Sequence, residues 1–116
     1  MTTVQVTADS LEVRLDPWEK VLGLLGNLRV PRSAVSDVEV VADGLGAPAG
    51  MRAPGLALPG RIKLGTWRRR GSTQYVAVRA GEPALRVTLT GQRYDSLLLG
   101  TPDANELAGK LRAADR

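Results

Sequence analysis

The sequence predicts a mainly β domain with two α-helices, an antiparallel sandwich or partly open barrel of about seven strands. Apolar and polar residues alternate in several short segments, which is typical of half-buried strands. Turn-forming residues separate these segments at short intervals and favour antiparallel neighbours. The last part of the chain has apolar residues at helical spacing, which predicts an amphipathic helix near 102–113.

The chain begins with a predicted β-hairpin and a short inserted helix. Residues alternate over 3–7 and again over 11–15, on either side of a turn. The helix is expected near 17–25. Asp16 can cap it, and Glu19 stands where a capping box needs a carboxylate.

The next part is expected to be less regular. Residues 28–31 predict a short extended piece that Pro31 ends, and a strand with an irregularity near Ser36 follows over 33–42. Residues 43–60 contain five Gly and three Pro, which predicts a long irregular loop. A loop of this length in a compact domain is commonly functional.

Residues 61–79 predict a second β-hairpin, around which the rest of the chain is organised. Its turn is expected at Gly71-Ser72. Over 75–78, Val76 and Val78 are expected on one side of the sheet and the alternating residues on the other.

Two strands and a helix complete the chain. The strand over 85–90 alternates and is expected to be half-buried, whereas the Leu-rich strand over 94–99 is expected to be buried on both faces. Thr101 can cap the final helix. Its apolar stripe, expected to cover the open end of the sandwich, consists of Ala104, Leu107, Ala108 and Leu111.

A resemblance covers nearly the whole chain. It is carried by Pro17-Trp18-Glu19, Val30-Pro31, Arg52-Ala53-Pro54-Gly55, Pro59-Gly60, Gly65-Thr66 and the strand over 94–99. In these runs the sequence resembles small, mostly uncharacterised actinobacterial proteins with a pleckstrin-homology (PH)-like fold. The resemblance implies a single PH-like domain over 1–116. The helix near 17–25 is extra to that pattern, and the sequence has no standard phosphoinositide-binding signature, so lipid specificity is not carried over.

Composition excludes several classes of chemistry. The chain has no His and no Cys, so imidazole general bases, Ser-His or Cys-His pairs, and His or thiolate metal sites are excluded. The net charge of +4 is uneven: residues 1–58 hold five Lys or Arg and seven Asp or Glu, and residues 59–116 hold eleven and five. The basic second half favours contact with an anionic partner.

The hairpin and the loop before it supply the candidate binding residues. They are Arg52, Arg61, Lys63, Trp67, Arg68, Arg69 and Arg70. Arg guanidinium groups can hold phosphate or carboxylate by paired hydrogen bonds, and an exposed Trp67 ring could enter a membrane interface or stack on a base. A solvated face, or protection of a sheet edge, would explain the same charges without a ligand.

Other patterns have simpler structural interpretations. Asp37 and Glu39 could form a carboxylate pair for acid–base chemistry, but a solvated strand face explains them better. The run 44–49 matches the letters of a dinucleotide fingerprint, yet Pro48 prevents the helix that such a site requires. Trp18 is expected to pack over a sheet edge rather than meet a ligand.

The sequence therefore predicts a non-catalytic interaction module that binds a protein or peptide partner. The alternative is peripheral binding to anionic lipid head groups through the basic hairpin. Nucleic-acid binding is disfavoured, and an enzyme is the weakest hypothesis. We expect no cofactor and no metal, a monomer or weak homodimer, and, because residues 1–15 lack a targeting pattern, a cytoplasmic or membrane-peripheral location.

Overall fold

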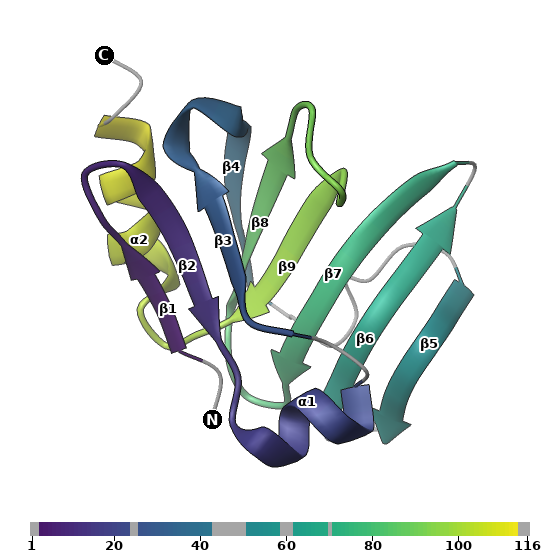
Figure 1. Ribbon diagram of the computed structural model, residues 1–116. Helices are drawn as coiled ribbons and strands as arrows, with labels where there is room; N and C mark the ends of the chain where they lie inside the picture. Colours follow the sequence, from purple (N-terminus) through teal and green to yellow (C-terminus); the bar gives the residue numbers. More distant parts are fainter. Residues whose placement is uncertain (1–2, 24–25, 43–50, 59–61, 70, 114–116) are drawn as a thin grey trace.

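The computed structural model describes residues 3–23, 26–42, 51–58, 62–69 and 71–113. Within these ranges the chain forms nine β-strands and two short α-helices, arranged as two sheets (Figure 1). The mainly β class with accompanying helices is confirmed. The two sheets, in the part of the chain described, do not close into a barrel.

The smaller sheet has three antiparallel strands in the order β1-β2-β3, and helix α1 connects its last two strands. Their bounds are β1 Thr3–Val6, β2 Ser10–Arg14, α1 Pro17–Gly23 and β3 Leu28–Pro31. The first hairpin is confirmed. Thr7 closes its turn, because the Ser10 N–H donates to Thr7 Oγ1 over 3.0 Å and the Thr7 N–H donates to the Ser10 carbonyl over 2.8 Å.

Helix α1 begins as the sequence predicts. The Asp16 N–H donates to Glu19 Oε1 over 2.8 Å, which is one half of a capping box. The Lys20 N–H donates to the Asp16 carbonyl over 3.1 Å and starts the helical hydrogen bonding. Residues 24–25 of the predicted helix lie outside the described residues.

The larger sheet has the order β4-β8-β9-β7-β6-β5. Its strands are β4 Val35–Val41, β5 Met51–Leu58, β6 Ile62–Arg69, β7 Ser72–Arg79, β8 Ala84–Leu89 and β9 Ser96–Gly100. The second hairpin, β6 with β7, is confirmed, with the positive φ of Gly71 (81°) in its turn. A 3₁₀ turn, Arg32–Ala34, leads from β3 into β4.

One strand pair corrects the antiparallel expectation. Strand β9 pairs with β8 antiparallel but with β7 parallel, because it inserts between these two earlier strands. The insertion suits its composition: Leu97, Leu98 and Leu99 are all fully buried, and a strand that is apolar on both faces needs a central position. A Cβ on Gly100 would lie 3.0 Å from the Val78 Cα, so a larger residue here would require the β7 backbone to shift by a few tenths of an ångström.

The expectation of an irregular loop over 43–60 is wrong for Met51–Leu58, which is strand β5. Pro54 is tolerated because β5 is the edge strand of the sheet and its register with β6 shifts between Arg52 and Gly55. The seven strands expected become nine because β5 is a strand and because β3 and β4 are separate strands in different sheets. Residues 43–50, which include the run resembling a dinucleotide fingerprint, lie outside the described residues.

The irregularity predicted near Ser36 is confirmed. The register of β4 against β8 shifts between Val35 and Asp37, so Ser36 is the extra residue of a bulge. The Ser36 hydroxyl donates to the Thr88 carbonyl over 3.2 Å, which ties the bulge to β8.

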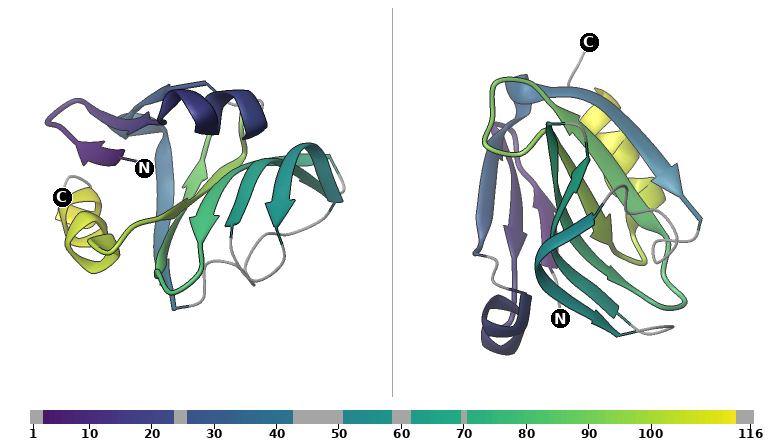
Figure 2. Two further views of the ribbon diagram at one scale, coloured as in Figure 1. Left: turned by 90° about the horizontal axis from the view of Figure 1, so that it is seen from below. Right: turned by 90° about the vertical axis from the view of Figure 1, so that its right-hand side faces the viewer.

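The main core lies between the two sheets, and it confirms the predicted alternation. Tyr75 and Ala77 of β7 belong to this core, whereas Val76 and Val78 belong to a small cluster on the opposite face of the larger sheet. Helix α2, Ala104–Ala113, packs against β1 of the smaller sheet and against β4 and β8 of the larger one (Figure 2). The apolar stripe predicted for this helix is buried: Ala104, Leu107, Ala108 and Leu111.

Candidate functional site

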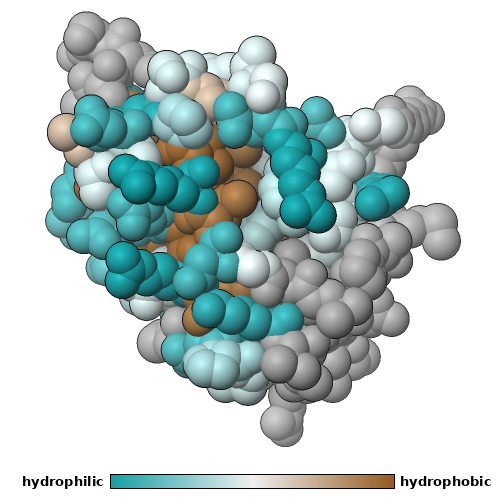
Figure 3. Space-filling model, in the orientation of Figure 1, coloured by the Kyte–Doolittle hydropathy of each residue, from teal (hydrophilic) through white to brown (hydrophobic). Residues whose placement is uncertain are grey.

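An apolar surface runs down the face of the molecule seen in Figure 1. Figure 3, in the same orientation, shows it as a strip with hydrophilic side chains on both sides, over β3 and the area between β3 and β7. We call the surface along Leu28–Pro31 the β3 strip. Leu28 is half-buried there and packs against the main core, whereas Arg29 is exposed.

A row of aromatic and basic side chains connects the start of β3 with the loop between β8 and β9. The Tyr75 hydroxyl donates to the Gly26 carbonyl over 2.9 Å. The Tyr94 ring meets the Tyr75 ring edge to face, with centroids 5.2 Å apart and planes at 85°. The Arg93 guanidinium lies 5.6 Å from the centre of the Tyr94 ring.

The Tyr75 phenol acts as a fixed donor. Burial raises its pKa above the ordinary value of 10.0, and the neighbouring Tyr94 and Glu19 raise it further. The hydroxyl therefore stays protonated at neutral pH, as its bond to the Gly26 carbonyl requires.

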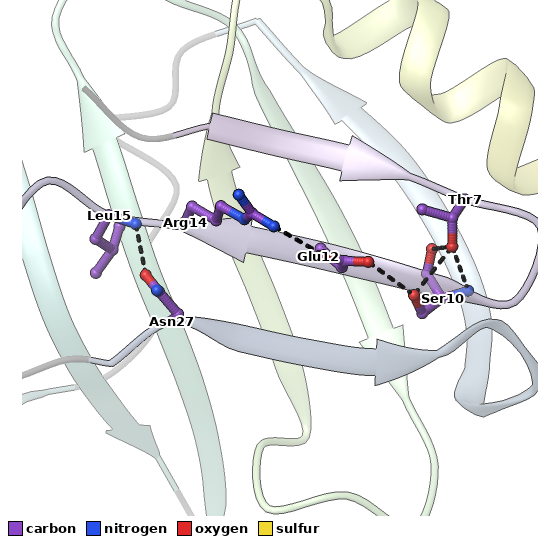
Figure 4. Close-up of polar contacts among 6 residues, drawn as sticks. All are labelled: Thr7, Ser10, Glu12, Arg14, Leu15 and Asn27. Atoms are coloured by element: carbon purple, nitrogen blue, oxygen red, sulfur yellow. Dashed lines mark hydrogen bonds and ion pairs between the residues drawn. The ribbon is translucent and has the colours of Figure 1, made fainter.

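The smaller sheet carries a chain of polar contacts beside the β3 strip, which Figure 4 shows along β2. The Ser10 hydroxyl donates to Glu12 Oε2 over 3.4 Å, and Arg14 Nη2 lies 3.7 Å from Glu12 Oε1. Glu12 also stands opposite Arg29 in the register of β2 and β3, but within the described ranges Arg29 forms no ion pair.

Asn27 fixes where β3 begins. Its side-chain Oδ1 accepts the Leu15 N–H over 2.9 Å, as Figure 4 shows, in the place that the Gly26 carbonyl would occupy if the ladder continued. The Gly26 carbonyl is therefore available to the Tyr75 hydroxyl. Asn27 and Tyr75 together hold the start of the β3 strip.

Helix α1 is anchored to β7 by a buried ion pair. The Glu19 carboxylate is fully buried and its Oε2 lies 2.8 Å from Arg79 Nη2. Trp18 differs from the sequence expectation, because it is 43% exposed and stacks beside the Arg79 guanidinium at 5.2 Å instead of packing over a sheet edge. These contacts position α1 and, through it, the approach to β3.

The structure does not bring the predicted binding residues onto one face. By strand alternation Lys63 and Trp67 lie on one face of β6, and Arg68 lies on the other. Trp67 is only 6% exposed, since it packs in the small cluster with Val76 and Val78, so it does not present the free ring that the sequence analysis expects.

For the other predicted binding residues, the structure describes the side chain of Arg68 but only the backbones of Arg52 and Arg69. Arg68 is exposed and, among the described residues, forms no ion pair. The backbones of Arg52 and Arg69 pair with Trp67 and Ser72, respectively. Arg61 and Arg70 lie outside the described residues.

The carboxylates of β4 lie on a solvated face, as the simpler interpretation predicts. Asp37 and Glu39 are both exposed, and Glu39 Oε2 lies 3.2 Å from Arg86 Nη1 across the sheet. Over the part of the chain that the structure describes, Asp and Glu side chains form no cluster able to hold a metal ion.

Comparisons with known proteins do not identify a relative. No protein-family model, curated protein or solved structure matches the chain. Neither of the helices in the described ranges has the length and apolar character needed to cross a bilayer.

Sequence reasoning missed Arg29, Tyr94 and the β3 strip. A signal was present: a strand of four residues that ends in Pro31 is typical of a sheet edge. No local pattern indicates that Tyr94 lies near this edge, because strands of two sheets bring them together.

Proposed function

We propose that the chain is a non-catalytic interaction module that binds a protein or peptide partner along the β3 strip. The observation that supports this most is the apolar strip of Figure 3, which hydrophilic side chains border on both sides. An apolar centre with a polar rim is the usual composition of a protein-binding surface. The absence of His and Cys from the sequence also removes the commonest catalytic groups.

The proposal includes a PH-like domain related to the actinobacterial proteins that the sequence resembles. Two sheets with a C-terminal helix packed across them support it. The parallel pairing of β7 with β9 departs from the antiparallel pattern of that fold. We place the protein in the cytoplasm, as a monomer or weak homodimer.

Photo-crosslinking tests the location of the partner site. Benzoylphenylalanine replaces Arg93, which is exposed beside Tyr94 in the row that leads to the start of β3, or Asn105, which is exposed on α2. We expect a discrete crosslinked partner from position 93 in cells of the natural host and none from position 105. Crosslinks from position 105 alone, or from neither position, would contradict a partner site on this face.

Peripheral binding to anionic lipid is the second candidate function. Its support is Arg68, an exposed cation at the end of β6 with no ion pair among the described residues. Each basic residue near an anionic surface contributes about 1 kcal/mol, so changing Arg68, Arg69 and Arg70 to Ala should abolish most of the binding. Sedimentation with phosphatidylserine vesicles at low salt checks this, and no binding by the wild type removes the hypothesis. A pull-down with the same triple variant shows whether protein partners use the hairpin.

A further inference from the structure

Among the described strands, β3 is an edge that pairs only with β2, and its register shows which backbone groups face away from the sheet. The Arg32 N–H donates to the Asp9 carbonyl over 3.0 Å, in the same register that pairs Leu11 with Val30. Hydrogen-bonded pairs alternate in an antiparallel ladder, so Arg29 and Pro31 turn their backbone groups away from β2. Pro31 has no N–H to offer there. The N–H and carbonyl of Arg29 have no backbone partner among the described residues.

The side chains of β3 alternate between the core and the outer side, and this alternation determines which of them an added strand would contact. Leu28 and Val30 face the core, whereas Arg29 and Pro31 are exposed on the outer side. A strand beside β3 would place alternate side chains next to the half-buried Leu28 and the almost fully buried Val30, and the others next to the Arg29 guanidinium. Glu12 contacts Ser10 and Arg14, and within the described ranges Arg29 forms no ion pair, so the Arg29 guanidinium can pair with an acidic side chain of an added strand.

A second copy of the chain fits this edge poorly. Two β3 strands that exchange the Arg29 backbone bonds around a two-fold axis would set two Arg29 side chains directly opposite each other. In the next possible register, one β3 strand moves by two residues along the other. Arg29 of each copy then lies opposite Pro31 of the other, which lacks an N–H. Arg29 and Pro31 thus protect the edge against self-association and leave it open to a partner of opposite charge.

We infer that the free edge of β3 accepts an extended peptide segment of a partner protein, with apolar and acidic residues in alternation, as a fourth strand of the smaller sheet. The inference rests on the proposed function and specifies its binding mode and ligand chemistry. Backbone hydrogen bonds to Arg29 supply the alignment, the β3 strip receives the apolar side chains, and the Arg29 side chain selects for the acidic ones.

The test uses the full chain labelled with ¹⁵N and a blocked seven-residue peptide, Thr-Val-Glu-Val-Glu-Val-Thr. Amide chemical shifts are recorded during titration, and amide hydrogen exchange is measured with and without the peptide. We expect the largest shift changes at residues 27–31, with slower exchange of the Arg29 N–H. A peptide with Lys in place of Glu should bind about tenfold more weakly or not at all, because it loses the charged contact.

Variants separate the backbone contact from the charge. Arg29→Glu should weaken binding by at least about tenfold and reverse the preference toward the Lys peptide. Arg29→Pro removes the outward N–H without touching a bond to β2, and it should weaken binding further. Arg68→Glu makes the same charge change on the distant hairpin and should leave binding within about twofold. Spectra that change only near the substituted residue show that each variant is folded.

Three outcomes of the titrations would overturn the inference directly. They are no binding at millimolar peptide, shift changes that depend on protein concentration at β3 without peptide, and binding that Arg29→Glu does not weaken. Peptide binding that maps to residues 62–79 would also overturn strand addition, but it would leave the broader function as a peptide-binding module in place. A partner that crosslinks from position 93, together with no peptide binding at β3, would likewise overturn strand addition and leave the broader function in place.

Discussion

Strands β3 and β4 follow each other in the chain, and each lies at the edge of a sheet, but only one edge is covered. Helix α2 packs on β4, and Arg112 Nη2 donates to the Val38 carbonyl over 3.0 Å. The Ser36 bulge further disrupts that edge. Strand β3 has no such cover among the described residues and keeps its outward Arg29 groups.

The difference shows that the fold protects these two of its edge strands by different means. At β4 the packed helix, the bond from Arg112 to the Val38 carbonyl and the bulge all hinder pairing with an added strand, whatever its sequence. Arg29 and Pro31 make β3 unavailable only to some strands, chiefly to its own copies. The helix and bulge at β4 stabilise the fold, whereas Arg29 and Pro31 leave a surface at β3 that can recognise a partner.

The largest effect is expected from loosening the cover of β4. Leu111→Ala removes a buried side chain from the contact of α2 with the sheets and should lower the free energy of unfolding by about 2–5 kcal/mol. Urea denaturation measures the loss, and Asn105→Ala on the exposed face of α2 is the control, with a change within about 0.5 kcal/mol. Equal effects of the two substitutions would show that α2 is not held by this stripe.

A smaller loss is expected where α1 leads toward β3. Arg79→Met leaves the buried Glu19 carboxylate without its cation and should cost about 3 kcal/mol, the lower end for buried pairs because Arg79 is 29% exposed. Glu19→Gln should cost less, since the Arg79 guanidinium can turn toward water. Thermal unfolding of both variants measures the two stability losses. A larger loss for Glu19→Gln than for Arg79→Met would contradict the burial of Glu19.

Tyr75→Phe removes the hydroxyl that holds the start of β3 and should cost about 1 kcal/mol at neutral pH. Burial raises the Tyr75 pKa in the folded state, so the unfolded chain loses this proton first as pH rises. The advantage of the wild type should therefore be constant below about pH 10 and decline above it. Unfolding free energies of both proteins between neutral and strongly alkaline pH check this, and a difference that grows above pH 10 would contradict it.

The smallest stability changes are expected from substitutions of Arg112 at the β4 edge and Arg29 at the β3 edge. Arg112→Ala removes the bond to the Val38 carbonyl and should cost up to about 1 kcal/mol, whereas Arg29→Ala should change stability by less than about 0.5 kcal/mol. Urea denaturation of both variants measures the contrast. If Arg29→Ala were the more destabilising, the β3 edge would have a structural partner within the fold.

Local sequence patterns were sufficient for most single elements. Alternation assigned Val76 and Val78 to the opposite face from Tyr75, and helical spacing identified the buried stripe of α2. The capping role of Glu19 and the irregularity near Ser36 followed from side-chain chemistry at particular positions. These features depend on residues close together in the chain.

Features that depend on distant segments could not be predicted in this way. Pro54 and Gly55 indicate a loop unless their strand is known to be an edge, and Trp67 appears exposed until Val76 and Val78 are placed beside it. The parallel pair of β7 with β9 is also invisible to local patterns, because a short connection from β7 to β8 ordinarily makes those strands neighbours. For the candidate site, sequence reasoning chose the densest run of charge and missed the β3 edge.

The insertion of β9 also has a kinetic consequence. Strands β7 and β8 become connected within the larger sheet only after residues 96–100 have entered between them. A chain emerging from the ribosome therefore cannot complete that sheet until Gly100 is free of the exit tunnel. We expect folding to be slow and limited by this late pairing of distant segments.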